Sequence, residues 1–350
     1  MKCNICYYNA EPGKWNPKSM EQIIEMYKTL LKVESEPDLV QVTWWEPTLH
    51  PQILEILRFL HASKVRHLML NTNGIKIAND DDFVAELQKI KKWFEVYLQF
   101  DSLNDDTLKQ IRNRSMIEIR EKALEKIEKA GISTTLVCVI QKGLNDNEIP
   151  EIIEYAKKWK CVRWVVFQPI SDVWRNKTSW DYRITLSEIR QKIIDDKTNE
   201  FEVEDMIPLP CDPHKISIWY AMKNIVDWNP IIKPVTWKIP KSFITDTRGT
   251  VAFEQDKKFV ENVIETISLD TAMSENILKD KIKSKLFCCW PDFISPKEVM
   301  YQNVFRIVIM EFSDFYNFDT TNIKRECNFM IEPNRAVPFS TFNMWLYENN

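Results

Sequence analysis

The chain has 350 residues, of which 44% are hydrophobic and 28% are charged, and its formal net charge is −4. This composition is ordinary for a folded protein of one large or two smaller domains, and it carries no general footprint of nucleic-acid binding. No apolar run approaches the roughly 18 residues that a membrane-crossing helix needs, and no signal peptide precedes Cys3. We therefore expect a cytoplasmic protein with no transmembrane segment and no nucleic-acid partner.

Helix-like and strand-like patterns alternate over the first half of the chain. In the segment 51–62, for example, Ile53, Leu57 and Leu60 recur at helical spacing. The expected helices are 17–33, 51–62, 80–92, 105–129, 147–158 and 186–197. The expected strands are 39–43, 67–71, 96–100, 134–140 and 162–167, with a later one at 303–312.

Strands separated by helices of this length indicate a parallel sheet with right-handed crossovers. The expected fold class is therefore α/β, a partial (β/α)6 barrel with an appended C-terminal α+β domain. We expect a first strand before Cys3, so that the barrel over 1–175 lacks its first strand and the chain begins inside its own site. Residues 176–205 are expected to form a helical connector, and 206–350, rich in Pro, Trp and scattered Cys, the C-terminal domain.

Two cysteines close to the N-terminus, Cys3 and Cys6, form a C-x-x-C pair. Two thiols cannot saturate an iron–sulfur cluster, and a plain pair of buried thiols is one interpretation. Read as the end of C-x-x-x-C-x-x-C, the pair predicts three thiolates around a [4Fe–4S] cluster, with the first cysteine two residues upstream of Met1. The aromatic pair after Cys6, which includes Tyr8, favours the cluster.

Polar motifs follow the expected strands at the ends where a barrel places its chemistry. They read WWEPT at 44–48, LNTNG at 70–74, LQFD at 98–101 and QP at 168–169. The structural alternatives are a pair of core tryptophans for the first motif and an ordinary Asn-Gly turn for the second.

In this order and spacing, the segments resemble the tetraether lipid synthase-like branch of the radical S-adenosylmethionine (SAM) superfamily, whose counterparts read G-G-E-P-T, L-N-T-N-G, L-Q-F-D-G and Q-P. The resemblance covers most of residues 1–175. It implies that Cys3 and Cys6 bind a [4Fe–4S] cluster whose open iron takes SAM, and that Glu46 accepts a hydrogen bond from the SAM amino group or braces its loop. The SAM-binding residues it implies are Tyr8, Trp44, Trp45, Glu46, Pro47, Asn71, Asn73, Asp101 and Gln168.

The resemblance continues more weakly towards the C-terminus, where family members bind auxiliary iron–sulfur clusters. The thiols that could serve such a site are Cys211, Cys288, Cys289 and Cys327. The chain departs from the family pattern there, with Glu326 and Ser340 in place of cysteines and Phe329 in place of a histidine. Unpaired cysteines in a decayed site are therefore the alternative, and Cys138 and Cys161 are expected to be core thiols.

The glycine and tryptophan counts are abnormal, because the chain has 5 Gly and 13 Trp where about 7% Gly is usual. By the resemblance, relatives carry glycine at the positions of Trp44, Trp45, Trp93, Trp164 and Trp174. One hypothesis is that the host reads the UGA codon as glycine, whereas common translation tables print tryptophan. The other is a degenerate copy that no longer binds SAM, which Ser102, Glu326 and Ser340 favour.

The resemblance implies an enzyme that uses one electron, from a partner such as ferredoxin or flavodoxin, to cleave SAM to methionine and a 5′-deoxyadenosyl radical. It suggests C–H activation for C–C bond formation on a lipid or another apolar substrate. Two alternatives stay open. One is a radical SAM methyltransferase or another small-molecule modifier, and the other is a catalytically dead barrel that has lost its cluster.

Overall fold

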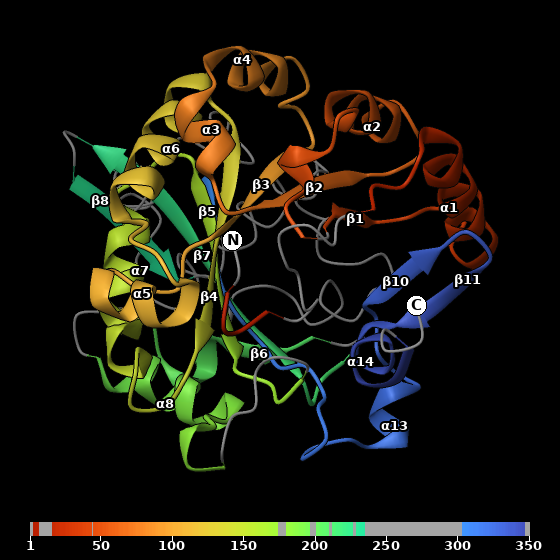
Figure 1. The fold of residues 1–350 in the computed structure, drawn as a ribbon. Coiled ribbons are helices and arrows are strands. Elements are labelled where there is room, and N and C mark those ends of the chain that lie inside the picture. Colours follow the sequence, from red (N-terminus) through yellow and green to blue (C-terminus); the bar gives the residue numbers. More distant parts are fainter. Residues whose placement is uncertain are drawn as a thin grey trace, which may run out of the picture.

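The computed structural model describes residues 3–6, 16–43, 45–173, 180–196, 201–209, 212–226, 229–234 and 303–346. Within these residues, nine strands form one sheet in the order β1-β2-β3-β4-β5-β9-β7-β6, with β8 paired to β7 (Figure 1). The first five run parallel. They are β1 (Leu39–Val42), β2 (His67–Thr72), β3 (Phe94–Gln99), β4 (Ser133–Ile140) and β5 (Val162–Pro169). The expected α/β class is confirmed.

Helices connect these strands and cover the outer face of the sheet (Figure 1). They are α1 (Met20–Val33), α2 (Ile53–His61), α3 (Ile75–Asn79), α4 (Asp81–Lys89), α5 (Asp105–Arg112), α6 (Ile117–Ala130), α7 (Ile149–Lys157) and α8 (Leu186–Asp195), with short 3-10 turns η1 (Pro47–Leu49), η2 (Asp146–Glu148), η3 (Trp180–Tyr182) and η4 (Val203–Asp205). Several begin at side-chain caps. Ser19 opens α1 with a capping box to Gln22, and Asp80 caps α4.

Two local differences from the expected helices have clear causes. The stretch expected as one helix, 105–129, is broken into α5 and α6, because Asn113 takes a left-handed conformation with φ of 59° and ends α5. The helix α3 was not expected, and it begins at Gly74, whose φ of 83° turns the chain sharply out of β2. A Cβ at Gly74 would lie 2.8 Å from the end of the Leu98 side chain, which would have to shift, and the positive φ itself favours glycine there.

The core lies between the parallel strands and their helices. Every residue of β4 and of β5 is buried, as is usual for strands covered on both faces. A buried ion network joins the amino ends of the strands, where Glu95 Oε2 is 3.2 Å from His67 Nε2 and 3.3 Å from Arg163 Nη1. Burial opposes ionisation of Glu95, but the hydrogen bond from His67 and the charge of Arg163 prevail and lower its pKa to about 2.

The C-terminal part extends the same sheet. The strand expected at 303–312 exists as β9 (Val304–Met310) and pairs in parallel with β5, while β7 (Ile216–Val226) pairs antiparallel with β9. The other elements are β6 (Met206–Pro208), β8 (Asn229–Pro234), α13 (Thr320–Ile323), β10 (Phe329–Glu332), β11 (Arg335–Pro338), α14 (Phe339–Thr341) and the π-helical turn η7 (Phe342–Leu346). The β10–β11 hairpin lies against α1 (Figure 1). The boundary expected at residue 206 stays a prediction.

No helix among the described residues is long and apolar enough to cross a membrane.

Candidate functional site

The carboxyl ends of the parallel strands gather the polar residues that the motifs place after them. Glu46 follows β1, Asn71 and Asn73 lie at the end of β2, Asp101 follows β3, and Gln168 lies near the end of β5. Because the strands are parallel neighbours, these residues share one edge of the sheet. This is the edge at which barrels of this kind carry their sites.

Hydrogen bonds between strands hold two of these side chains in place. Asn71 Nδ2 donates to Thr43 Oγ1 at 3.3 Å, and Asn71 Oδ1 accepts from Gln99 Nε2 at 3.1 Å. Gln168 Nε2 donates to the hydroxyl of Tyr97 at 3.0 Å. The side chains thus form a preset polar lining at the carboxyl edge.

Three further residues implied by the resemblance lie at turns beside this edge. Asn73 Oδ1 accepts from the backbone N–H of Ile75 at 2.9 Å and so helps to start α3. Pro47 is the buried first residue of η1. Trp45 is half-buried, and its indole Nε1 is buried without a hydrogen-bond partner.

Glu46 is a brace between β1 and β2. Its Oε1 accepts from the hydroxyls of Thr48 and Thr72, both at 2.7 Å, and from the Thr48 N–H at 3.3 Å. Its Oε2 accepts from the N–H of Asn73 at 2.8 Å. A carboxylate has about four acceptor positions, and these four bonds occupy them. Burial raises the pKa of Glu46, and the four donors oppose that rise.

Replacing this carboxylate tests the brace. Glu46→Gln is expected to lower the free energy of unfolding by about 1–3 kcal/mol, because an amide places a donor against one of the four donors and leaves it unsatisfied in the interior. Urea unfolding measures the change. The control is Glu55→Gln on the exposed face of α2, which is expected to stay within about 0.5 kcal/mol. An equal effect of the two substitutions would contradict the brace.

The Cys3–Cys6 loop docks at the same edge, against the end of α5. The N–H of Asn4 donates to the carbonyl of Ile111 at 3.0 Å, and Ile5 is buried in a cluster with Ile111, Val139 and Ile170. Val139 lies near the end of β4, and Ile170 directly follows β5. Cys3 is buried and Cys6 is half-buried. Both thiols therefore lie beside the carboxyl ends of the central strands.

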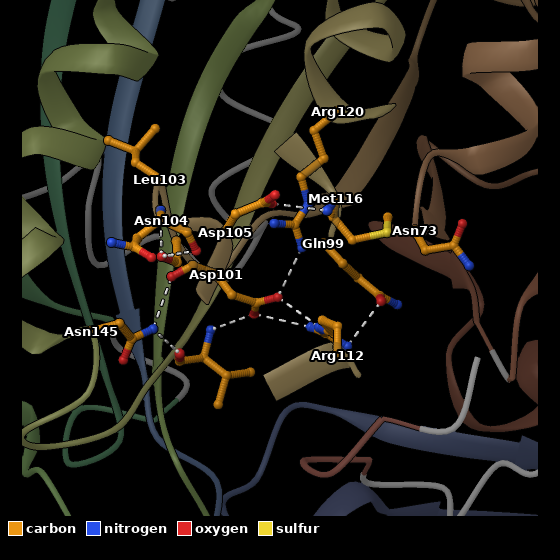
Figure 2. A network of polar contacts seen from close by, with 12 residues as sticks. Asn73, Gln99, Asp101, Leu103, Asn104, Asp105, Arg112, Met116, Arg120 and Asn145 are labelled. Atoms are coloured by element: carbon orange, nitrogen blue, oxygen red, sulfur yellow. Dashed lines mark hydrogen bonds and ion pairs between the residues drawn. The ribbon is translucent and has the colours of Figure 1, made fainter. Parts of the chain in front are cut away.

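Arg112, the last residue of α5, connects this loop to the strand end. Its guanidinium hydrogen-bonds the Cys3 sulfur and holds Asp101 with two bonds, 2.7 Å from Nε and 3.0 Å from Nη2. Nη1 also donates to Gln99 Oε1 at 3.1 Å. Arg120 adds a third bond to Asp101 at 3.2 Å. Figure 2 shows Asp101 at the centre, with the two arginines on one side of it.

Asp101 also fixes the backbone around it. Its Oδ1 accepts from the N–H of Val139 at 3.1 Å, and its own carbonyl accepts from Asn145 Nδ2 at 2.8 Å (Figure 2). Its φ of 61° is left-handed, a conformation that aspartate tolerates better than most residues. Burial opposes its ionisation, but the charges of Arg112 and Arg120 and the bond from Arg112 hold its pKa below the usual range.

The described residues fit part of a cluster site. Cys3 and Cys6 place two thiols at the correct edge, next to a guanidinium whose charge suits bound thiolates. No third His, Cys, Asp or Glu joins them within the part of the chain that the structure describes. A cluster with three protein thiolates would take its third from outside those residues. Burial raises the pKa of Cys138 and Cys161, which fits the expectation of core thiols.

Several predicted residues lie outside the described part of the chain. They are Tyr8, Trp44, Cys211, Cys288 and Cys289. Of the four thiols considered for an auxiliary cluster, Cys327 alone is described, and it is exposed. The auxiliary site stays a prediction.

A polar pocket lies close by, and the sequence did not predict it. Its lining includes Asp212, Lys215, Glu311, Glu326 and Ser340. Glu311 follows β9, whose carboxyl end lies beside that of β5. Ser171, next to the Ile170 that packs on the cysteine loop, donates to the carbonyl of Phe312 in the pocket wall at 3.4 Å. The pocket thus opens at the same edge of the sheet as the thiols.

The lining of this pocket places one lysine, Lys215, beside its carboxyl groups. Lys215 Nζ is 3.4 Å from Glu311 Oε2, and Ser340 donates to Glu326 Oε1 from its N–H at 3.0 Å and its hydroxyl at 3.1 Å. Burial raises the pKa of Glu326 to about 7, and nearby Asp212 adds to the rise. Glu326 and Ser340 are therefore hydrogen-bonded partners.

The raised pKa of Glu326 makes stability depend on pH. The folded protein disfavours the ionised carboxylate, so the contribution of Glu326 to stability is largest below its ordinary pKa of 4.5 and is lost as pH rises from 4.5 to about 7. Glu326→Gln is expected to remove about 3 kcal/mol of this loss. Urea unfolding at a series of pH values measures it. The exposed Glu118→Gln should leave the profile unchanged, and an unchanged profile in Glu326→Gln would contradict the assignment.

The residues that sequence reasoning missed give weak local signals. Arg112 reads as an ordinary basic residue in the last turn of an amphipathic helix. The available sign of its role was its place on the buried face of α5, where a charged residue is unusual. The pocket residues come from segments far apart in the sequence, so no single motif could have found them.

Residues 1–156 match the sequence model of the Radical SAM superfamily. The 7,8-dihydro-6-hydroxymethylpterin dimethyltransferase of Methanocaldococcus jannaschii is 27% identical over 387 residues, which cover 98% of this chain and 74% of that protein. The GTP 3′,8-cyclase of Synechocystis is 30% identical over 156 residues, which cover 44% of this chain and 46% of the cyclase.

Among solved structures, Streptococcus suis SuiB bound to S-adenosylmethionine has 17% identity and a TM-score of 0.43, over 55% of this chain and 42% of SuiB, a likeness too distant to bear on function. The sequence relatives named above are a methyltransferase and a cyclase, and they give no support to the tetraether lipid synthase-like branch. The match over 1–156 and these relatives support an enzyme whose first 156 residues are similar to the radical SAM superfamily.

Proposed function

We propose that this enzyme cleaves SAM with one electron from a reductant such as ferredoxin or flavodoxin and abstracts a hydrogen atom from a small polar substrate. The observation that carries the proposal is the docking of the Cys3–Cys6 loop through Arg112 onto Asp101, at the carboxyl edge of the parallel sheet. When bound, a [4Fe–4S] cluster supplies the electron that splits SAM into methionine and a 5′-deoxyadenosyl radical.

The side chains of this protein hold the loop that bears the thiols and orient the groups that line the carboxyl edge. Arg112 and Asp101 position the loop that bears the thiols, and Glu46 fixes the turn between β1 and β2. Asn71 and Gln168, set by their bonds to Gln99 and Tyr97, line the edge where SAM would lie. Side chains locked in this way keep their geometry without reorganisation when a ligand binds.

The relatives favour a polar substrate over a lipid. The compounds in the relatives' names, a dihydropterin and GTP, share a 2-amino-4-oxopyrimidine ring. The N–H groups of this ring can donate hydrogen bonds to a carboxylate. We therefore prefer an enzyme that modifies a small polar molecule. Methyl transfer is one reaction of this kind. Lipid C–C bond formation is the alternative.

Isotope transfer tests this function. The reconstituted enzyme, SAM and dithionite would be incubated in ordinary buffer with one of three substrates deuterated at carbon: 6-hydroxymethyl-7,8-dihydropterin, GTP, or glycerol-ether lipid vesicles. A parallel incubation of the undeuterated substrate in D₂O would measure deuterium that comes from solvent. We expect one of the heterocycles, deuterated at carbon, to pass deuterium into 5′-deoxyadenosine. Labelled SAM then separates methyl transfer, in which the label enters the product, from other chemistry. Deuterium transfer from the lipid and from neither heterocycle would contradict the polar substrate.

A scaffold without catalysis is the second candidate, and the observation in its favour is the presence of two rather than three thiols at the edge within the described residues. Anaerobic reconstitution distinguishes the candidates. Bound iron with charge-transfer absorbance supports the enzyme, whereas no bound iron supports the scaffold.

A further inference from the structure

The backbone at Trp93 suits glycine rather than tryptophan. Trp93 lies between α4 and β3 with φ of 60°, in the left-handed region, where a bulky side chain is strained. Among the described residues, the other non-glycine positions in this region are Asp101 and Asn113, types that tolerate it. Gly74, Gly131 and Gly143 all have positive φ as well. Trp93 therefore occupies a position of the kind that this chain otherwise gives to glycine, Asp or Asn.

Trp164 lies in β5 with an unsatisfied indole donor. It lies directly opposite Arg306 of β9, whose Cζ is 3.1 Å from the centre of the Trp164 ring. Its indole Nε1 is buried and has no hydrogen-bond partner. The register between β4 and β5 also shifts beside it, at Thr134 and Thr135, and glycine is common at such irregularities.

Trp45 shows the same lack of a partner directly before the brace. Its indole Nε1 is buried and has no hydrogen-bond acceptor. The carboxylate of the next residue, Glu46, accepts from other donors. A buried donor without an acceptor is costly, so natural interiors rarely keep one.

Two other described tryptophans have ordinary indole contacts. Trp219 has no exposed surface, and its Nε1 donates to the carbonyl of Glu202 at 3.3 Å. Trp159 packs on Tyr155 with ring centres 6.0 Å apart. Among the tryptophans that the structure describes, Trp159 and Trp219 have the contacts that indoles usually have, whereas Trp45 and Trp164 have an unsatisfied indole donor and Trp93 has a left-handed backbone.

We infer that residues 45, 93 and 164 are glycine in the protein that the host cell makes, and that UGA encodes them. Independent mutations of glycine codons would introduce many residue types. If the host reads UGA as glycine and the translation table reads it as tryptophan, every such position shows tryptophan. The low glycine and high tryptophan counts have the same explanation. The inference does not depend on the proposed function, because it concerns backbone strain and packing.

The codons and the cellular protein give the direct test. We expect UGA at codons 45, 93 and 164 and glycine in the matching peptides of protein from the host, with UGG and tryptophan at 159 and 219. UGG at 45, 93 and 164, or tryptophan in those peptides, would overturn the inference.

Thermal unfolding gives an independent test on the tryptophan-bearing chain. Trp93→Gly is expected to raise Tm by about 2–4 °C, the reverse of the usual effect of removing a large side chain. The matched control Trp219→Gly should lower Tm by more than that amount or prevent folding, because it removes a fully buried side chain. A fall in Tm for Trp93→Gly like that of the control would contradict the inference.

Discussion

Asp101→Asn is expected to lower the free energy of unfolding by about 3–5 kcal/mol, the usual cost of breaking a buried ion pair from one side. The substitution removes the one carboxylate that both Arg112 and Arg120 contact, and all three side chains are buried. The asparagine amide keeps the shape but not the charge. Chemical denaturation at neutral pH measures the loss.

The chain offers an exposed ion pair as the matched control. Asp106 and Lys109 lie 2.9 Å apart on the surface of α5, so Asp106→Asn should cost no more than about 1 kcal/mol. The wild-type protein should also lose the contribution of Asp101 in acid. Because the folded pKa of Asp101 is lowered, its stabilisation is present above 3.8 and disappears as pH falls through the folded value. Equal effects of the two substitutions would contradict the central place of Asp101.

Cys3→Ala is expected to abolish iron–sulfur absorbance and SAM cleavage while the fold is kept. Cys3 is buried at the carboxyl edge and held by Arg112, but it lies in a loop outside the main core. Circular dichroism checks the fold, iron and sulfide assays check the cluster, and 5′-deoxyadenosine formation checks the chemistry.

Cys138→Ala is the control for that experiment. Its thiol is fully buried in β4, where burial raises its pKa and disfavours the thiolate that a metal needs. The control should keep its iron and its rate of SAM cleavage. Unchanged iron content in Cys3→Ala would show that the Cys3–Cys6 loop is not the cluster site.

Much of the first half of the fold could be predicted, because its strands and helices have strong, separate patterns. The five parallel strands lie within one or two residues of their expected positions. The break at Asn113 was missed because the helical pattern continues on both sides of it. The strands β6 and β8 were missed because they are short and contain proline, whereas β7 carries a run of β-branched and aromatic residues that the sequence could have indicated.

The site was predictable where it rests on strand order and not where it rests on distant pairing. Glu46, Asn71, Asp101 and Gln168 follow strands, and parallel topology alone brings them to one edge. The bond between Arg112 and the cysteine loop depends on how α5 packs, which no local pattern encodes. The addition of β9 to the barrel sheet likewise depends on pairing between residues more than 130 positions apart, as in Phe167 with Ile309.

The most direct test of the radical SAM account is SAM cleavage by the protein as its own cell makes it, isolated without oxygen. The account predicts bound iron and sulfide and, on addition of dithionite and SAM, methionine and 5′-deoxyadenosine in equal amounts. Protein that is folded, holds no iron and leaves SAM intact would contradict it.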